Sequence, residues 1–333
     1  MAEKIDFVLA WVNGNDPAWQ KERNKYGSHC EGDNRDIRFR DWNNLQFWFR
    51  AVEKFASWCG TVHFVTWGHL PPWLNLEHPR LNIVRHEDYL PEEYLPTFSS
   101  HTIELNLHRI RNLAERFVYF NDDTFITRAV SPEDFFKQSL PRDSAVIMPI
   151  IGTFRNSTAG IEANNMEIIN TVFNKNKVIR KNPFKWFNLL YGKHLFSTLC
   201  CMPYKRFAGF YVPHLPNAYL KKTFYQLWEQ EGVVLHRTSL HKFRESRGVN
   251  QSLIRYWQLV SGNFIPRSTA VGRCFSLTNH NEDAVEAIST SKYQLICIND
   301  NDCEPIIDFE REKTLINRAF EKILPEKSSF ELK

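Results

Sequence analysis

Runs of apolar residues mark where this chain is predicted to form buried strands. The runs at 5–12, 62–66 and 81–84 are rich in β-branched and aromatic side chains. This composition is typical of short strands covered on both faces of a parallel sheet. The run at 117–120 has the same character, and 145–149 predicts one more strand. The pattern therefore favours a buried sheet over one that faces solvent.

Between these runs, apolar residues recur every three to four positions, as on the buried face of a helix. The first helix is predicted between Asp41 and Gly60, and the second begins at Ser99 or Ser100 and extends to about residue 114. Further helices are predicted at 219–230, 250–260 and 309–323, with a short capped one at 131–134, whereas 20–40 is predicted as a loop and 150–200 as mixed helices and loops.

The alternation of strands and helices predicts an α/β protein with a mostly parallel, twisted sheet flanked by helices. No internal repeat and no low-complexity linker divides the sequence. We therefore predict a single domain at 1–333. Within it, 1–150 are expected to form the α/β core, and 151–333 a helical and loop region that completes the functional site.

Composition is that of a globular protein and argues against nucleic-acid binding. Hydrophobic residues make up 43% of the chain and charged residues 24%. The net charge is only +4, without a dense Lys/Arg run or a nucleic-acid-binding motif, so we expect no nucleic-acid partner. Mild basicity is compatible with anionic substrates and with peripheral membrane association. The 14% of aromatic residues suits a cleft that stacks on sugars or bases, although a large core also consumes aromatics.

The spacing of the cysteines and the hydropathy of the chain indicate the cellular compartment in which the protein is expected. The seven cysteines show no C-x-x-C spacing, which predicts neither a zinc site nor a disulfide framework. There is no apolar segment of signal-peptide length at the start, and no run approaches the ~20 apolar residues that span a bilayer. We expect a reduced, cytoplasmic protein whose membrane contact would be peripheral, at the inner face of the cell membrane.

Candidate chemistry begins at the polar residues Asn121, Asp122 and Asp123, which directly follow the apolar run 117–120. Ligands of open α/β sheets bind beyond the carboxyl ends of the strands. Two adjacent carboxylates there can hold a hard cation such as Mg²⁺, although the same residues also make ordinary turns. Neither G-x-G-x-x-G nor a P-loop occurs, which disfavours dinucleotide and P-loop chemistry.

Two other segments carry candidate ligand-binding residues. The turn at 13–17 follows the first predicted strand, a common nucleotide-binding position. The helix start at Ser99 and Ser100 could receive a phosphate or be an ordinary cap, and Glu104 lies four residues before His108 on the predicted helix.

A histidine and a basic segment complete the candidates. His214 lies on stiff backbone between two prolines, which suits a positioned imidazole, although a lone histidine is more often structural. His241 and Arg244 could clamp a phosphate or belong to a solvated basic loop.

Taken together and in order, these segments resemble the conserved blocks of the Stealth family of sugar-phosphate transferases. The resemblance rests on 5–17, 40–66, 72–74, 95–104, 108–123, 213–214, 241–244 and 324–331. It covers nearly the whole chain, so it is specific where each motif alone is not.

The resemblance implies a Rossmann-like or GT-A-like fold in which 1–150 bind a nucleotide sugar. It also implies transfer of hexose-1-phosphate, with an N-acetylhexosamine expected, from a UDP-sugar donor to a hydroxyl of a glycan acceptor. UMP leaves and a phosphodiester forms, in synthesis of a capsular or cell-surface polysaccharide. The form of the chain is that of the microbial, capsule-type branch.

The resemblance also suggests roles for individual residues. Asp122 and Asp123 would bind Mg²⁺ (or Mn²⁺), or one of them would accept the acceptor's proton, with His214 as the rival base. Arg244 and His241 would clamp the diphosphate. The remaining predicted substrate-binding residues are Trp11, Asn13, Gly14, Asp16, Arg40, Ser99, Ser100, Glu104, Asn121 and Asn250.

Two other functions are compatible with the same residues. A metal-dependent glycosyltransferase of the GT-A type would use the acidic pair with the same donor but release UDP. An inactive carbohydrate-binding protein would use the aromatic cleft without consuming a donor. The sequence does not identify an oligomeric state.

Overall fold

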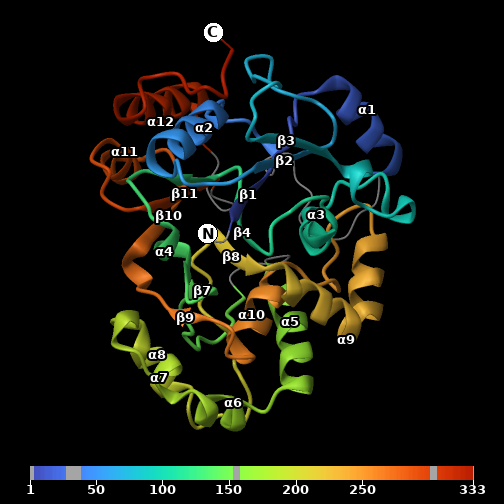
Figure 1. The fold of residues 1–333 in the computed structure, drawn as a ribbon, viewed down its shortest axis with the longest axis vertical. Coiled ribbons are helices and arrows are strands. Elements are labelled where there is room, and N and C mark those ends of the chain that lie inside the picture. Colours follow the sequence, from blue (N-terminus) through green and yellow to red (C-terminus); the bar gives the residue numbers. More distant parts are fainter. Residues whose placement is uncertain (1–3, 28–38, 153–157, 301–305, 333) are drawn as a thin grey trace.

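The computed structural model describes residues 4–27, 39–152, 158–300 and 306–332. Its central sheet has five strands in the order β3-β2-β1-β4-β8 (Figure 1). These strands are β1 (Ile5–Ala10), β2 (Val62–Thr66), β3 (Leu81–Arg85), β4 (Arg116–Asn121) and β8 (Asn217–Leu220). The first four run parallel, and β8 is antiparallel to β4. The mostly parallel α/β sheet predicted from the sequence is confirmed.

Both faces of this sheet are covered, which explains the unbroken apolar runs. Along β4, Val118 and Phe120 belong to one hydrophobic core, and Phe117 and Tyr119 to the other. All four side chains are fully buried. Since successive side chains of a strand point to opposite faces, a strand between two cores must be apolar at every position.

The first core lies between the sheet and α2 (Leu45–Phe55), α11 (Glu282–Ser289) and α12 (Phe309–Ile323) (Figure 1). A second sheet of three short strands, β5 (Thr124–Ile126), β10 (Gly272–Leu277) and β11 (Leu295–Asp300), packs there too. Strand β5 pairs antiparallel with β11 and follows β4 after only two residues. The acidic turn thus joins the two sheets.

The second core is covered by α3 (Ser100–Leu105) and by helices that follow residue 158 in the chain. The latter are α5 (Ala159–Val172), α9 (Lys221–Leu240) and α10 (Ser252–Val260). Helices α6 (Lys175–Lys181), α7 (Pro183–Trp186) and α8 (His194–Cys200) extend this layer at the bottom of Figure 1. The other elements are α1 (Pro17–Tyr26), α4 (Pro132–Phe135), β6 (Phe136–Lys137), β7 (Leu140–Asp143) and β9 (Ile265–Pro266), besides short 3₁₀ turns. In the described part of the chain, no helix combines the length and the apolarity needed to cross a bilayer.

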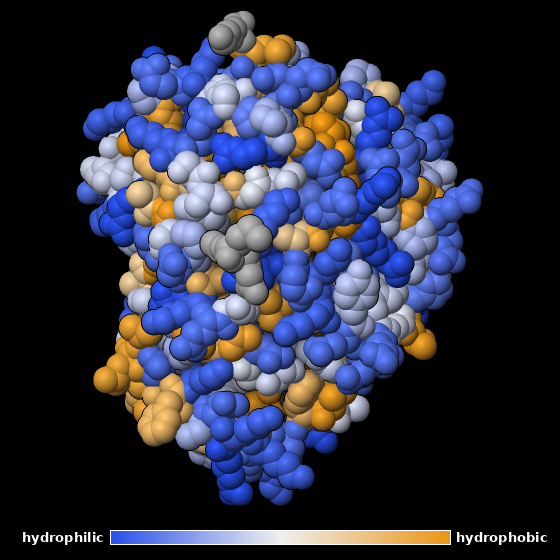
Figure 2. Space-filling model, in the orientation of Figure 1, coloured by the Kyte–Doolittle hydropathy of each residue, from blue (hydrophilic) through white to orange (hydrophobic). Residues whose placement is uncertain are grey.

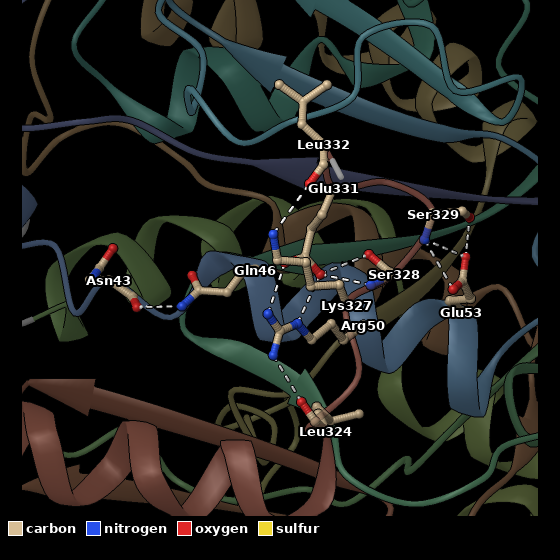
Figure 3. A network of polar contacts seen from close by, with 10 residues as sticks. All are labelled: Asn43, Gln46, Arg50, Glu53, Leu324, Lys327, Ser328, Ser329, Glu331 and Leu332. Atoms are coloured by element: carbon tan, nitrogen blue, oxygen red, sulfur yellow. Dashed lines mark hydrogen bonds and ion pairs between the residues drawn. The ribbon is translucent and has the colours of Figure 1, made fainter.

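The C-terminal tail is fastened to α2 by a polar network (Figure 3). Arg50 donates to both carboxylate oxygens of Glu331 at 2.8 and 2.9 Å, and to the carbonyl of Leu324 at 3.0 Å. The Ser328 amide donates to Glu331 at 2.8 Å. Only 12% of the Arg50 side chain and 4% of the Glu331 side chain are exposed, so this bidentate pair is largely shielded from water.

Three predicted elements were wrong in part. The predicted loop at 20–40 begins inside α1, which Asp16 caps by accepting a hydrogen bond from the Trp19 amide at 2.8 Å. Residues 28–38 of that loop lie outside the described residues. The predicted strand at 145–149 makes one isolated bridge, between Ile147 and Phe210. The helix predicted from 219 begins at Lys221, because 217–220 pair with β4 instead.

The helix predicted from 99 to 114 is also wrong in its length. Helix α3 ends at Leu105, where the Asn106 side chain donates to the Thr102 carbonyl at 2.8 Å and to the Ser239 hydroxyl at 3.1 Å. A side chain that bonds the local backbone competes with the helix in this way. Glu104 and His108 therefore do not share a helix face.

Candidate active site

A cavity of about 470 Å³ opens at the carboxyl ends of β1 and β4. Its wall is built by residues after β1, by α3, by the acidic turn and by segments around 212–217, 244–252 and 298–300. This is the edge where an open α/β sheet binds its ligand. Of the predicted site residues, the cavity is lined by Trp11, Arg40, Ser100, Glu104, Asn121, Asp122, Asp123, His214, Arg244 and Asn250.

The acidic turn is held rigidly between the two sheets. The Thr124 hydroxyl donates to the Asn121 carbonyl at 2.7 Å, and the Ile298 amide of β11 donates to the Asp123 carbonyl at 2.9 Å. Because these two bonds fix the backbone of the turn, they also fix the positions from which the side chains of Asp122 and Asp123 extend. The turn predicted from composition is therefore present, and Asp122 and Asp123 line the cavity there.

Asp122 is exposed to the cavity but surrounded by protein walls. Poor hydration inside these walls, and the nearby carboxylates of Asp123 and Asp41, raise the pKa of Asp122 to about 7. The positive charge of Arg244 acts in the opposite direction. A proton or a cation is therefore favoured at this position near neutral pH.

His214 faces the acidic turn from a segment ninety residues later in the chain. Its Nε2 lies 3.2 Å from Asp123 Oδ2. Its backbone φ is +49°, in the left-handed region that non-glycine residues rarely occupy. Burial alone would lower the pKa of His214, but the Asp123 carboxylate raises it to about 9. The contact with Asp123 therefore favours the protonated form of His214 at neutral pH.

Two further groups complete the electrostatic pattern. Glu104 is buried and accepts a hydrogen bond from the Tyr119 hydroxyl at 3.1 Å. Burial raises the pKa of Glu104 to about 7, against the opposing charge of Arg244. His101, also buried beside Arg244, has its pKa lowered to about 3 and is neutral. The cavity thus combines acidic groups near one strand end with several cationic groups, among them Arg244 and His214.

Oxygen donors for a divalent cation are present in the acidic turn. Within the part of the chain that the structure describes, Asp123 Oδ1 is buried and has no hydrogen-bond partner. Such an atom is a natural ligand for a cation, and Asp122 and Asp41 offer further carboxylate oxygens close by. Asp122 and Asp123 therefore fit the hard ion expected from the sequence.

A softer set of donors overlaps this one. Asp123, His214 and Cys297 offer one ligand atom each within 4.8 Å of one another. The Cys297 thiol donates to Asp123 Oδ2 at 3.5 Å, and Cys274 is its register partner on the neighbouring strand. No sequence signal pointed to these two cysteines. The pairing of β11 with β5 brings Cys297 to the turn, and the pairing of β10 with β11 places Cys274 beside it.

Five predicted site residues do not line the cavity. Asp16 caps α1, Gly14 lies where a Cβ would collide with the Phe39 carbonyl, and the Asn13 amide donates to His69 at 2.7 Å. Ser99 is buried at the start of α3, and His241 pairs with Glu245 at 2.5 Å.

The other predicted binding residues occupy different parts of the wall. Arg40 lies 3.5 Å from Asp300 and over the ring of Phe309. Trp11 stacks on Phe64. The side chain of Asn250 accepts from Asn165 at 2.7 Å.

Sequence reasoning missed Arg255, which also lines the cavity. It is 2% exposed and binds both oxygens of Asp143, at 2.7 and 2.8 Å. The sequence feature that could have identified it is that Arg255 is the one charged residue within the apolar helix 252–260. Asp41, which helps to raise the pKa of Asp122, was noted only as a helix boundary.

Comparison with known proteins identifies the family of the chain. Two family models match the chain, Stealth protein CR1, conserved region 1, at 3–29 and Stealth protein CR2, conserved region 2, at 38–143. The capsular polysaccharide phosphotransferase WcwK of Streptococcus pneumoniae is 45% identical over 334 residues, which cover 99% of both chains. The receptor polysaccharide phosphotransferase WefC of Streptococcus gordonii is 39% identical over 338 residues, the whole of both chains.

A third relative comes from another genus. The exopolysaccharide phosphotransferase cps2G of Lactiplantibacillus plantarum is 39% identical over 331 residues, which cover 98% of this chain and 96% of that protein. Identity at this level over whole chains, together with both conserved regions, confirms the resemblance seen in the sequence. The chain therefore belongs to the Stealth family and is a phosphotransferase.

Proposed function

We propose that this enzyme transfers hexose-1-phosphate from a UDP-sugar to a hydroxyl of a glycan acceptor, in the synthesis of a capsular or other cell-surface polysaccharide. We expect the sugar to be an N-acetylhexosamine. The observation that carries the proposal is the joint presence of the acidic turn, His214 and Arg244 on one cavity wall. Relatives named polysaccharide phosphotransferases support the class of reaction and of acceptor.

The bonds that change follow from the products. The acceptor oxygen attacks the phosphorus that carries the hexose, and the bond from that phosphorus to the bridging oxygen breaks. UMP leaves with the bridging oxygen, and a phosphodiester joins hexose and acceptor. Such a transfer needs positioning and neutralisation of charge on the non-bridging oxygens more than covalent chemistry by the protein.

We assign the metal site to the acidic turn. Asp123, through its unpartnered Oδ1, and Asp122 would hold Mg²⁺ or Mn²⁺. When bound, the ion neutralises charge on the diphosphate. The alternative is that Asp123 alone holds the ion and Asp122, which is exposed to the cavity, takes the acceptor's proton.

Arg244 and the His214 imidazolium are assigned to the charge on the transferred phosphate. Both face the cavity from segments more than ninety residues after the acidic turn. His214 is held by Asp123 at 3.2 Å, so its ring orientation is fixed before a substrate arrives. This assignment favours His214 as a proton-bearing group over its predicted role as a base, because the ion pair keeps the imidazole protonated.

The nucleotide is assigned to the part of the cavity beside β1. Trp11 and Phe39 line this side and offer aromatic surface for the base, and Arg40 offers a charge. Ser100, Glu104, Asn121 and Asn250 lie on the remaining wall, where the sugar and acceptor would bind. His241, Ser99, Asn13, Gly14 and Asp16 would then support the wall from behind rather than touch the substrate.

The released nucleotide tests the proposal. The enzyme is incubated with Mg²⁺, a panel of nucleotide sugars and a phosphoglycan primer, and the nucleotide product is identified by chromatography. UMP supports hexose-1-phosphate transfer. UDP would instead mean glycosyl transfer, and sugar binding without donor consumption over hours would mean a carbohydrate-binding protein. Asp123→Asn is the matched inactive control.

A further inference from the structure

Large apolar side chains are exposed together on the face formed by α7, α8 and the residues that connect them. Leu189 is 88% exposed and Phe184 84%, and Phe196, Leu199 and Tyr204 are also exposed. We call residues 184–204 the α7–α8 face. In Figure 2, apolar colour gathers at the lower left, where α7 and α8 lie in Figure 1. A contiguous apolar surface of this kind marks an interaction site.

A hollow of about 480 Å³ lies on the same face. Phe196 and Tyr204 form part of its wall together with Met148 and Cys200. The exposed aromatic residues therefore border a groove with room for an apolar chain. This groove is separate from the cavity at the acidic turn, with which it shares no lining residue.

The charged residues in and around this face are positive. Residues 168–228 contain ten Lys and Arg and no Asp or Glu. The whole chain carries +4, so the other residues together carry −6. Exposed basic side chains adjoin or interrupt the apolar ones in sequence, namely Arg180, Lys181, Lys193, Lys205 and Arg206. The face is therefore apolar with a basic rim.

Two other lysines of this segment hold the face in shape. Lys175 is buried and donates to the carbonyls of Cys201 and Met202 at 2.9 and 3.0 Å, where α8 ends. Lys185 donates to the carbonyls of Gly262 and Phe264, both at 2.7 Å. These bonds anchor α7 and α8 to the body of the protein, so the exposed apolar residues project from a fixed scaffold.

We propose that the α7–α8 face docks on an anionic lipid bilayer, with its apolar side chains in the interfacial region and its basic rim on the headgroups. Apolar insertion combined with cationic contacts is how a peripheral protein binds such a surface. A second copy of the chain is a poorer occupant, because two faces of the same positive charge repel each other. The proposal goes beyond the transfer reaction and does not depend on the donor.

A short stretch of chain connects the α7–α8 face with the cavity. From α8 the chain continues through Phe210 and Val212 to His214, and Val212 is both exposed and part of the cavity wall. The chain therefore leads directly from the α7–α8 face to His214, which contacts Asp123 of the acidic turn. An acceptor glycan held at a membrane surface could then reach the cavity while the enzyme stays bound.

Vesicle binding tests the inference. The full-length enzyme is sedimented with vesicles of phosphatidylcholine alone and with vesicles that contain phosphatidylglycerol. We expect binding to the anionic vesicles, weakened by added salt. The triple variant Phe184→Ser, Leu189→Ser, Phe196→Ser should bind at least about tenfold more weakly, since it loses three exposed apolar side chains. The control is Val233→Ser, Ile307→Ser, which changes two residues that are 83% and 90% exposed elsewhere.

The outcomes separate this inference from the proposed function. Equal binding by the wild type and the triple variant, or no binding to anionic vesicles, would overturn the membrane inference. A dimer that the triple variant abolishes, without vesicle binding, would overturn it in favour of a second copy. UMP release with a soluble acceptor should be the same in all three proteins, so a failure of the reaction would be seen independently.

Discussion

Replacement of Asp123 by Asn should change the protonation of His214 at neutral pH. A pair of unit charges 3.2 Å apart interacts by about 5 kcal/mol at an effective dielectric constant of 20. Because 42% of the imidazole is exposed, screening by water reduces this to about 1–3 kcal/mol, or roughly 1–2 pH units. In Asp123→Asn, burial would then be opposed only by the weaker effects of Cys274 and Glu104, and the pKa of His214 should fall from about 9 toward neutrality.

The measurement is an NMR titration of metal-free protein labelled at its histidine rings. His214→Gln identifies the signal of His214. In the wild type, we expect this signal to keep the chemical shift of an imidazolium up to about pH 8. In Asp123→Asn, we expect it to titrate near neutral pH. The matched control is Asp41→Asn, which removes another cavity carboxylate that does not bond the imidazole. An unchanged titration of His214 in Asp123→Asn would refute the reasoning.

Three other predictions follow from the same contacts. The pKa of Glu104 is raised to about 7, so its ionisation above that pH should repel the diphosphate and raise the donor KM; Glu104→Gln should flatten this pH dependence. Glu331→Ala should lower the free energy of unfolding in urea by about 3–5 kcal/mol because Arg50 loses its shielded partner. Burial raises the pKa of Glu331, but the hydrogen bonds from Arg50 and Ser328, together with the charge of Arg50, lower it more, so the pKa lies below its usual value. The stability that this pair contributes should therefore be present at neutral pH and be lost as the pH falls through the pKa of Glu331 in the folded protein. Zn²⁺ should inhibit the transfer reaction of the wild type at lower concentrations than that of Cys297→Ser, since a thiol favours zinc over magnesium. Equal inhibition of the two proteins would contradict this.

The strands of the central sheet could be predicted because their burial is local information. Strands β1 and β4 are covered on both faces, so apart from the buried Asp6 their interior positions are apolar and the run is visible in the sequence. Helix α12 was predicted with the bounds that the structure shows, 309–323, because its apolar stripe is regular and it begins at the capping residue Asp308. Local pattern and tertiary environment agree in these elements.

Elements that depend on distant pairing could not be predicted in the same way. The second half of strand β8, residues 219–220, was taken as the start of a helix, since nothing in 217–220 reveals the edge of β4 that the strand joins. Helix α3 ends early because the Asn106 side chain finds a partner in Ser239, which lies 133 residues away. Such contacts are decided by the fold and leave no periodic signal.

The candidate site shows the same division. The acidic turn could be predicted because it directly follows a buried strand. That His214 and Arg244 share a cavity with it rested on the family resemblance, since 91 and more residues separate them from Asp123. Cys297 came from neither source, because only the register of β11 with β5 brings its thiol to the turn.

The central claim is that this cavity moves a phosphate together with the sugar. A donor labelled with ³²P only at the phosphorus that carries the hexose tests it most directly. After incubation with Mg²⁺ and a glycan acceptor, the account predicts that the label is in the glycan and that the released nucleotide is unlabelled. Label that stays with the released nucleotide while the sugar reaches the glycan would contradict it.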